Sequence, residues 1–318
     1  MEQQEINKPT IKNTLLPDNI IDSAISHDIR IINKITANQR TILEHYEEGI
    51  QPLVLEGTPL DGGSVQHYYH FVLDLLLPLS ILIKRTPSDM VFNFFYLGPL
   101  TAHLEQLFGE RVNILKEENE DYKCLPLIGM SPVGLREINF NLGVLRNTVI
   151  NRFIKKTPQI DIKKIILIER VAPDPFYMTE AVNKGGGSQR RSIVNYSELR
   201  ALIEQKISNQ YEFVNLVLEE MTFEEQVQQF NTASLVIGLH GAGLSNIIWM
   251  KPECQVIEIG FRSCEHFQRI SQIMRHHHLT YMNFEEVHIT IDIPHFSSWL
   301  DAQPELTAFM KVSTQITK

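Results

Sequence analysis

The sequence lacks the features that would assign its class at once. Its three cysteines, Cys124, Cys254 and Cys264, show no close CxxC spacing, and its longest apolar run, residues 75–83, is short and interrupted by Pro78. Unpaired cysteines are typical of a reducing compartment, where we expect them to be small buried side chains. No apolar signal segment occurs near the start. We therefore predict a cytoplasmic protein with no transmembrane segment.

Basic residues are also scarce. Lys and Arg number 29 against 38 Asp and Glu, a net charge of −9, which argues against nucleic acid as a partner. Hydrophobic residues (43%) and charged residues (21%) occur at globular levels, which excludes disorder and coiled coil. A length of 318 residues suits about two domains. Any phosphate group would have to be bound by a few well-placed cations.

Strand-like and helix-like segments alternate along the chain, as in a doubly wound parallel α/β sheet. In the first half, a strand pattern at 91–97 precedes a helical pattern at 102–108. In the second half, apolar runs predict four strands, at 165–168, 211–218, 235–237 and 256–259. Capping pairs predict two helices between them, with Asn195 and Glu198 at one start and Thr222 and Glu225 at the other.

A polar, lysine-rich stretch at 151–164 predicts the boundary between two domains. We expect an N-terminal domain over residues 1–155, a second domain over 156–290 and a C-terminal helical segment over 291–318.

Small residues gather in one turn, 238–246, between an expected strand and an expected helix. His240, Gly241, Ala242 and Gly243 lie at its centre. Glycines allow backbone N–H groups to approach an anion, and a helix N-terminus adds a favourable dipole. The spacing matches neither GxGxxG nor the Walker loop. The turn is therefore either an anion-binding loop or a tight packing turn.

Two arginines and a glutamate are expected at the same rim of the sheet. Arg170 follows the strand at 165–168, Arg191 precedes the helix at Asn195, and Glu258 lies in the last strand. Ligands bind at the carboxyl ends of parallel strands. The guanidinium groups would clamp a diphosphate and Glu258 would accept hydrogen bonds from a ribose. The alternatives are solvated arginines and a salt-bridged carboxylate.

A polar stripe interrupts the apolar stretch that follows residue 66. On a helix, His67, His70 and Asp74 share one face, so the stripe must point to a cavity, a partner or water. A His–Asp pair suits a general base, because the carboxylate orients the imidazole and stabilises its protonated form. The alternatives are structural side chains at a domain interface and, less favoured, a zinc site.

Two further runs attract attention. Residues His276, His277 and His278 would point in three directions on a helix, so we expect a solvated helix end rather than a metal site. The glycines at 185–187 predict a flexible loop that could close over a ligand.

Together, these motifs resemble the family 61 glycosyltransferases from roughly residue 60 to residue 260. The matching features keep the family's order and spacing: His70, Asp74, Pro78 and Leu79; Arg170; residues 191–195 with Glu198 and Leu199; residues 240–246; and residues 256–259.

The resemblance implies a GT-B arrangement, in which two Rossmann-like domains face each other across a cleft, with the acceptor on the N-terminal side and the donor on the C-terminal side. It also implies an inverting, metal-independent transfer without a cofactor, from a UDP-sugar such as UDP-xylose or UDP-N-acetylglucosamine. The acceptor would be a hydroxyl of a glycan or glycolipid in polysaccharide or glycoprotein glycan synthesis, which leaves room for peripheral membrane contact.

Carried over by position, Arg170, Arg191 and the loop from His240 to Gly243 would hold the diphosphate, and Glu258 the ribose. His70 and Asp74 would face the acceptor. Asp61 competes with His70 as the base. A further alternative is a nucleotide-sugar or glycan-binding protein without catalysis on the same scaffold; a hydrolase is disfavoured because no GxSxG elbow is present.

Overall fold

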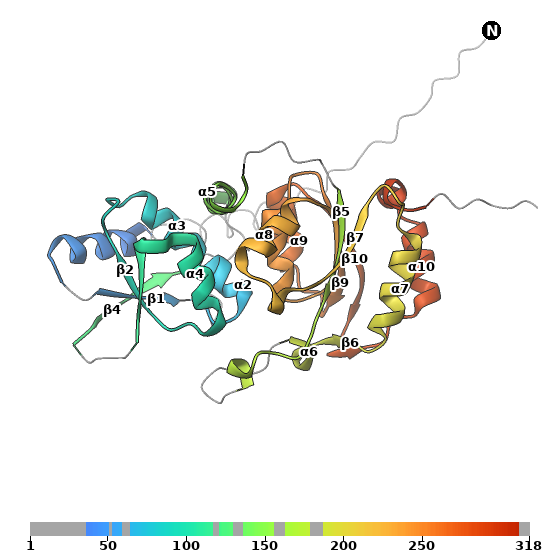
Figure 1. Ribbon diagram of the computed structural model, residues 1–318, viewed down its shortest axis with the longest axis horizontal. Coiled ribbons are helices and arrows are strands. Elements are labelled where there is room, and N and C mark those ends of the chain that lie inside the picture. Colours follow the sequence, from blue (N-terminus) through green and yellow to red (C-terminus); the bar gives the residue numbers. More distant parts are fainter. Residues whose placement is uncertain are drawn as a thin grey trace, which may run out of the picture.

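The computed structural model describes residues 36–50, 53–58, 64–116, 121–129, 136–155, 163–178 and 187–311. These residues form mixed α/β structure with parallel sheets, as predicted (Figure 1).

The N-terminal half is built on a four-stranded parallel sheet in the order β3-β2-β1-β4. Its strands are β1 (Leu53–Thr58), β2 (Phe92–Phe95), β3 (Val112–Leu115) and β4 (Lys123–Ile128). A helix over residues 36–47 precedes them. The other helical segments are α2 (Tyr68–His70), the π-helical η1 (Phe71–Leu76), α3 (Leu77–Lys84), η2 (Gly98–Leu100), α4 (Thr101–Phe108), η3 (Gly109–Arg111) and α5 (Arg136–Phe153).

The C-terminal half contains a five-stranded parallel sheet in the order β10-β9-β8-β5-β7. Its strands are β5 (Lys164–Glu169), β7 (Glu212–Val217), β8 (Ala233–Leu239), β9 (Gln255–Phe261) and β10 (His277–Phe284). A separate parallel pair is formed by β6 (Ser192–Ile193) and β11 (His288–Ile289). All seven residues of β9 are buried, which explains its continuous apolar pattern.

Helices cover both faces of this second sheet (Figure 1). Towards the N-terminal half lie α8 (Phe223–Asn231) and α9 (His266–Met274), and on the opposite face lie α7 (Tyr196–Lys206) and α10 (Ile293–Asp301). Short helical segments complete the half: η4 (Pro175–Met178), α6 (Gly187–Arg190), η5 (Leu218–Glu220), η6 (Ala242–Trp249) and η7 (Pro304–Phe309).

One hydrophobic cluster is shared by the two halves. It includes Phe71 and Leu73 from the first half together with Ile166, Phe223 and Trp249 from the second. A separate cluster packs α7 and α10 on the outer face of the five-stranded sheet. The described parts of the two halves therefore pack against each other through apolar side chains.

Two predicted helix starts have different outcomes. Thr222 and Glu225 form the reciprocal capping box that opens α8, as predicted. Asn195 does precede α7, but its side chain does not cap the helix. Instead, it donates to the backbone oxygen of Ile291 and accepts from the backbone N–H of the same residue, both at 2.9 Å. The predicted N-cap position of Asn195 is confirmed, but the side chain does not cap the helix because a tertiary contact engages it.

The segment after the small-residue turn is helical, as predicted. It is η6, a 3-10 helix over Ala242–Trp249. Helices occur between residues 293 and 309, within the expected C-terminal segment. The expected boundary at 155/156 adjoins residues outside the described ranges, and the domain limits stay predictions.

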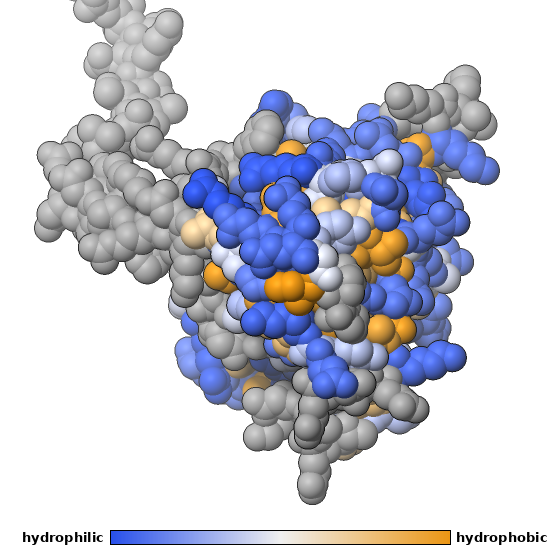
Figure 2. All heavy atoms as spheres, turned by 90° about the vertical axis from the view of Figure 1, so that its left-hand side faces the viewer, coloured by the Kyte–Doolittle hydropathy of each residue, from blue (hydrophilic) through white to orange (hydrophobic). Residues whose placement is uncertain are grey.

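No helix among the described residues is long and apolar enough to cross a membrane. Figure 2 shows the end of the molecule formed by the N-terminal half, where hydrophilic residues cover most of the described surface and hydrophobic residues form small separate groups.

Candidate functional site

A cavity of about 200 Å³ lies where the two halves meet. His67 and Tyr68 at the start of α2 line it from the N-terminal half, together with His103 in α4. From the other half, residues that follow the ends of β5 and β8 line it, including Arg170 and the loop 241–244. The carboxyl edge of the parallel sheet thus forms one wall, as expected for a ligand site.

Arg170 is bound to the backbone of two neighbouring loops. Its Nη1 donates to the carbonyl of His240 (3.2 Å) and its Nη2 to the carbonyl of Gly187 (2.9 Å). Burial lowers the pKa of Arg170 to about 10, so the group keeps its charge at neutral pH. Arg170 therefore contributes a fixed positive charge to the cavity wall.

Arg191 is held differently, by an aromatic ring. Its guanidinium lies 4.6 Å from the ring centre of Phe261, and Arg262 lies 4.7 Å from the same ring. Its buried Nε has no hydrogen-bond partner among the described residues. Burial, together with the positive charges of Arg170 and Arg190, lowers the pKa of Arg191 to about 10. An anion in the cavity would satisfy both the free donor and the clustered charge.

Acidic side chains also line the cavity. Glu169, Asp174 and Glu219 join the three arginines, Arg170, Arg190 and Arg191. Burial raises the pKa of Glu219, although the nearby Arg170 opposes this shift. The cavity thus offers carboxylates for hydroxyl groups or for a proton, besides cations for an anion.

The loop after β8 presents backbone donors to the cavity. Gly241, Ala242 and Gly243 all line it. Ala242 and Gly243 are the first residues of η6, so their N–H groups have no acceptor within the helix. The predicted anion-binding character of this turn is therefore compatible with its geometry, although the segment behind it is a 3-10 helix.

Asn246, which lines the cavity, joins α2, α8 and η6. Its Oδ1 accepts from Tyr68 Oη (2.7 Å) and Trp249 Nε1 (2.8 Å), and its Nδ2 donates to Gln226 Oε1 (3.1 Å) and the carbonyl of Gly243 (3.2 Å). Burial raises the pKa of Tyr68, which keeps its hydroxyl as a donor. This network fixes the loop against the N-terminal half.

We expected Glu258 at a strand end, and this prediction was wrong. Glu258 is inside β9, opposite Gly238 of β8, and only 2% exposed. His240 Nδ1 hydrogen-bonds its Oε1, and His278 Nε2 lies 2.9 Å from its Oε2. Burial raises the pKa of Glu258, but these two contacts outweigh burial and lower it. A contact with a ribose would require the histidines to release the carboxylate.

His70 and Asp74 form the predicted pair. Nδ1 of His70 and Oδ2 of Asp74 are 2.7 Å apart. Asp74 is 2% exposed and packs near Gly129, so it points into the protein rather than to solvent. Of the predicted stripe, His67 lines the cavity, whereas His70 and Asp74 are not among its lining residues. Asp61, the competing base, lies outside the described residues.

The prediction that the histidine run forms a solvated helix end was wrong. α9 ends at Met274, and His277 already belongs to β10. His276 is 8% exposed, and its Nε2 lies 2.9 Å from the carbonyl of Ile247, while His278 contacts Glu258. The period of a strand, not a helix, separates these side chains.

The cysteines are not the small buried side chains that we expected: Cys124 is exposed, and Cys254 and Cys264 are only partly buried. The glycine run lies outside the described residues except for Gly187, whose carbonyl binds Arg170.

Comparison with known proteins identifies the family of the chain. The family model described as Glycosyltransferase 61 matches residues 68–257, which is more than half of the chain and includes the cavity loops of both halves. The chain belongs to the glycosyltransferase 61 family. It is therefore a glycosyltransferase, and the predicted family is confirmed.

A curated relative of this glycosyltransferase is "Protein O-linked-mannose beta-1,4-N-acetylglucosaminyltransferase 2" of Tetraodon nigroviridis. It is 24% identical over 217 residues, which cover 62% of this chain and 35% of the relative. The chain thus spans about a third of the length of this relative.

Several residues of the glycosyltransferase site were missed by the sequence analysis. Arg190 adjoins the predicted Arg191, and the two consecutive arginines were a signal in the sequence that could have identified it. Tyr68, Gln226 and Asn246 gave none, because their hydrogen bonds join segments distant in sequence. Cys264 and His266 lie next to His240, a grouping that no spacing rule indicated.

Proposed function

We propose that this glycosyltransferase transfers a sugar from a UDP-sugar bound in the cavity to a hydroxyl of a glycan or glycolipid acceptor. The observation that carries the proposal is Arg191, whose buried Nε lacks a partner among the described residues while Arg170 and Arg190 add charge beside it. A diphosphate is a ligand that matches this arrangement in charge and in hydrogen-bonding capacity.

The donor is oriented with its diphosphate at Arg170, Arg191 and the loop from Gly241 to Gly243. The curated relative is named for N-acetylglucosamine transfer, which makes UDP-N-acetylglucosamine the first donor to test, with UDP-xylose as the second. Glu258 is held by two histidines, so Glu169 or Glu219 in the cavity is better placed to accept hydrogen bonds from the ribose.

The transfer is a single in-line displacement with inversion. The acceptor oxygen forms a bond to the anomeric carbon, the bond from that carbon to the diphosphate oxygen breaks, and UDP leaves. The arginines and the loop N–H groups stabilise the charge that develops on the leaving diphosphate, in place of a metal ion. His70, oriented by Asp74, takes the proton of the acceptor hydroxyl.

The proposal includes a GT-B arrangement, with the acceptor on the side of the four-stranded sheet. The support is the cavity itself, which has lining residues from both halves. A non-catalytic nucleotide-sugar-binding protein would have the same cavity but would produce no transferred sugar.

The test is thermal denaturation with UDP, GDP, CMP and UDP-N-acetylglucosamine, each measured with EDTA and without it. A ligand at about a hundred times its Kd adds about 2.7 kcal/mol to the free energy of unfolding. We expect UDP and its sugar conjugate to stabilise the chain, and Arg191→Ala to abolish the effect. Arg200→Ala, an exposed arginine on α7, is the matched control and should leave it intact.

Release of UDP coupled to a glycan product, detected by mass spectrometry, then separates catalysis from binding. The donor site would be overturned if no uridine nucleotide stabilised the chain. It would also be overturned if UDP stabilised the Arg191→Ala variant as much as the unchanged chain.

A further inference from the structure

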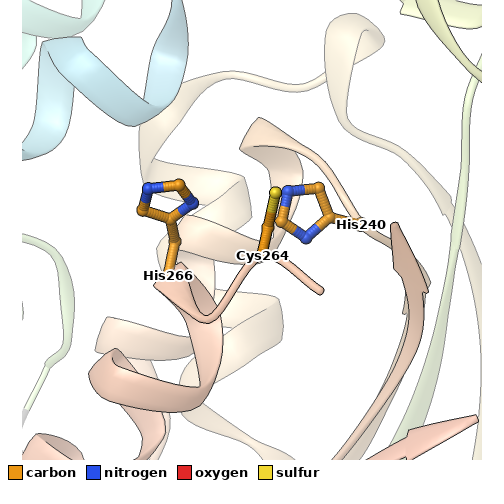
Figure 3. Close-up of side chains that lie close together, drawn as sticks. All are labelled: His240, Cys264 and His266. Atoms are coloured by element: carbon orange, nitrogen blue, oxygen red, sulfur yellow. The ribbon is translucent and has the colours of Figure 1, made fainter. Parts of the chain in front are cut away.

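Three potential metal ligands lie together beside the donor loop. One ligand atom each from His240, Cys264 and His266 falls within 4.8 Å of the others. His240 follows β8, Cys264 lies in the turn after β9, and His266 is the first residue of α9. Figure 3 shows the two imidazole rings on either side of the Cys264 sulfur. None of the three lines the cavity described above.

His240 is oriented from behind by a carboxylate. Its Nδ1 is hydrogen-bonded to Oε1 of Glu258, which leaves Nε2 as its ligand atom. Histidine ligands in metal sites commonly bind a carboxylate through the second ring nitrogen, which fixes the tautomer and the ring orientation. Glu258 is itself held by His278 on its other oxygen. The first ligand is therefore preorganised.

The turn that carries Cys264 has an unusual backbone. Arg262 and Ser263 both have left-handed backbone angles, with φ of 49° and 52°. Non-glycine residues rarely adopt this conformation. The backbone N–H of Cys264 donates to the carbonyl of Phe261 (3.0 Å), which closes the turn and places Cys264 next to His240.

We propose that His240 Nε2, Cys264 Sγ and a ring nitrogen of His266 bind one zinc ion, with water as the fourth ligand. Two imidazoles and a thiolate are a typical zinc donor set. Tetrahedral zinc requires ligand atoms roughly 3.5 Å apart. Small rotations of Cys264 and His266, which are only partly buried, bring the atoms together.

The charges balance. The Cys264 thiol loses its proton to solvent when the metal binds. The thiolate and the Glu258 carboxylate then offset the two positive charges of zinc, so the ion is compatible with Arg191, which is close enough to Cys264 for an electrostatic interaction. Because the ligands lie outside the cavity lining, the ion ties the loop after β8 to α9 and positions this loop rather than acting on the substrate.

The test measures metal binding by the full chain and is independent of the proposed donor. The chain is loaded with zinc chloride, dialysed against metal-free buffer and assayed for zinc. A parallel sample receives cobalt(II), whose thiolate-to-metal absorption reports the cysteine ligand. We expect one bound metal per chain and a thiolate–cobalt band.

Cys264→Ser should abolish the cobalt band, and both Cys264→Ser and His266→Gln should weaken zinc binding at least tenfold. Glu258→Gln should weaken zinc binding by about 10- to 100-fold. Cys124→Ser, at an exposed cysteine, and His277→Gln, at an exposed histidine paired with Glu253, are the controls and should bind zinc normally. Circular dichroism of each variant without metal verifies folding.

Substoichiometric zinc in the folded wild type would overturn the site. So would full binding by the folded double variant Cys264→Ser/His266→Gln, or loss of binding in His277→Gln. A chain that binds zinc but not UDP would reject the donor proposal and keep this one.

Discussion

The guanidinium of Arg170 occupies the space that a side chain at Gly241 would need. A Cβ at residue 241 would overlap Nη1 of Arg170, the atom that donates to the carbonyl of His240. The backbone of Gly241 is extended, a conformation open to any residue, so close approach and not φ requires glycine here. The loops after β5 and β8 are positioned against each other by this contact.

Gly241→Ala should therefore damage donor binding more than folding. Displacing Arg170 removes charge-assisted hydrogen bonds worth about 1.5–3 kcal/mol each, so we expect the Kd for UDP to rise at least about tenfold. Titration calorimetry measures this change. Gly143→Ala in α5, where a Cβ meets nothing within 4 Å, is the control; it should leave Kd unchanged and stabilise the helix by up to about 1 kcal/mol. Equal Kd values for the two variants would contradict the argument.

Asp74→Asn tests the proposed base. The amide keeps the size of the side chain but removes the charge that stabilises protonated His70. We expect kcat to fall by about 10²- to 10⁴-fold with KM for the donor little changed. Steady-state kinetics should be compared with Glu219→Gln, which changes a cavity carboxylate. A large loss of kcat in Glu219→Gln with normal turnover in Asp74→Asn would assign the proton transfer to the cavity instead.

Two buried histidines should make the protein sensitive to mild acid. Burial lowers the pKa of His103 and of His276 to about 4, from an ordinary value near 6.5. Between these values the unfolded chain binds more protons, so stability is lost as pH falls. Each histidine should cost about 2 kcal/mol between pH 7 and pH 5.

Urea denaturation at the two pH values measures this loss. His103→Phe keeps an aromatic ring against Phe223. In this variant the loss of stability between pH 7 and pH 5 should be smaller by the contribution of one histidine. The same pH dependence in both proteins would exclude His103 as a source.

Asn246→Ala should be among the most destabilising single changes in the site. It leaves the buried donors of Tyr68 and Trp249 and the oxygen of Gln226 without their partner. An unsatisfied buried group costs about 1–3 kcal/mol, so we expect a loss of about 3 kcal/mol or more. Chemical denaturation measures it. Asn113→Ala removes an exposed hydrogen bond to Asn93 and should cost less than about 1 kcal/mol.

The parallel α/β architecture could be predicted because hydrophobic patterns are local. The strand at 165–168 and the capping box at Thr222 depend on residues close in sequence, and both are present in β5 and α8. Arg170 was placed at the sheet rim by the same reasoning, since it directly follows a buried strand.

The errors concern side chains that are engaged by distant partners. Asn195 was expected to cap a helix with its side chain, but this side chain is hydrogen-bonded to the backbone of Ile291. Glu258 was expected at a strand end, but it is buried and contacts His240 and His278. The histidine run was assigned to a helix because the start of β10 has no clear period in sequence. Such pairings depend on how the strands are ordered in the sheet, which a single sequence does not specify.

The shared hydrophobic cluster limits how the molecule can open. His103 stacks on Phe223 at 5.2 Å, and Tyr69 meets Phe267 at 5.9 Å, so aromatic rings from the first half lie against α8 and α9 of the second. Swinging the sheets apart would expose this seam to water, at about 1.5–3 kcal/mol for each large side chain. Ligand exchange that leaves this seam closed costs less free energy. We therefore expect ligands to enter and leave by movement of the loops at the cavity rim, and not by a hinge motion between the two halves.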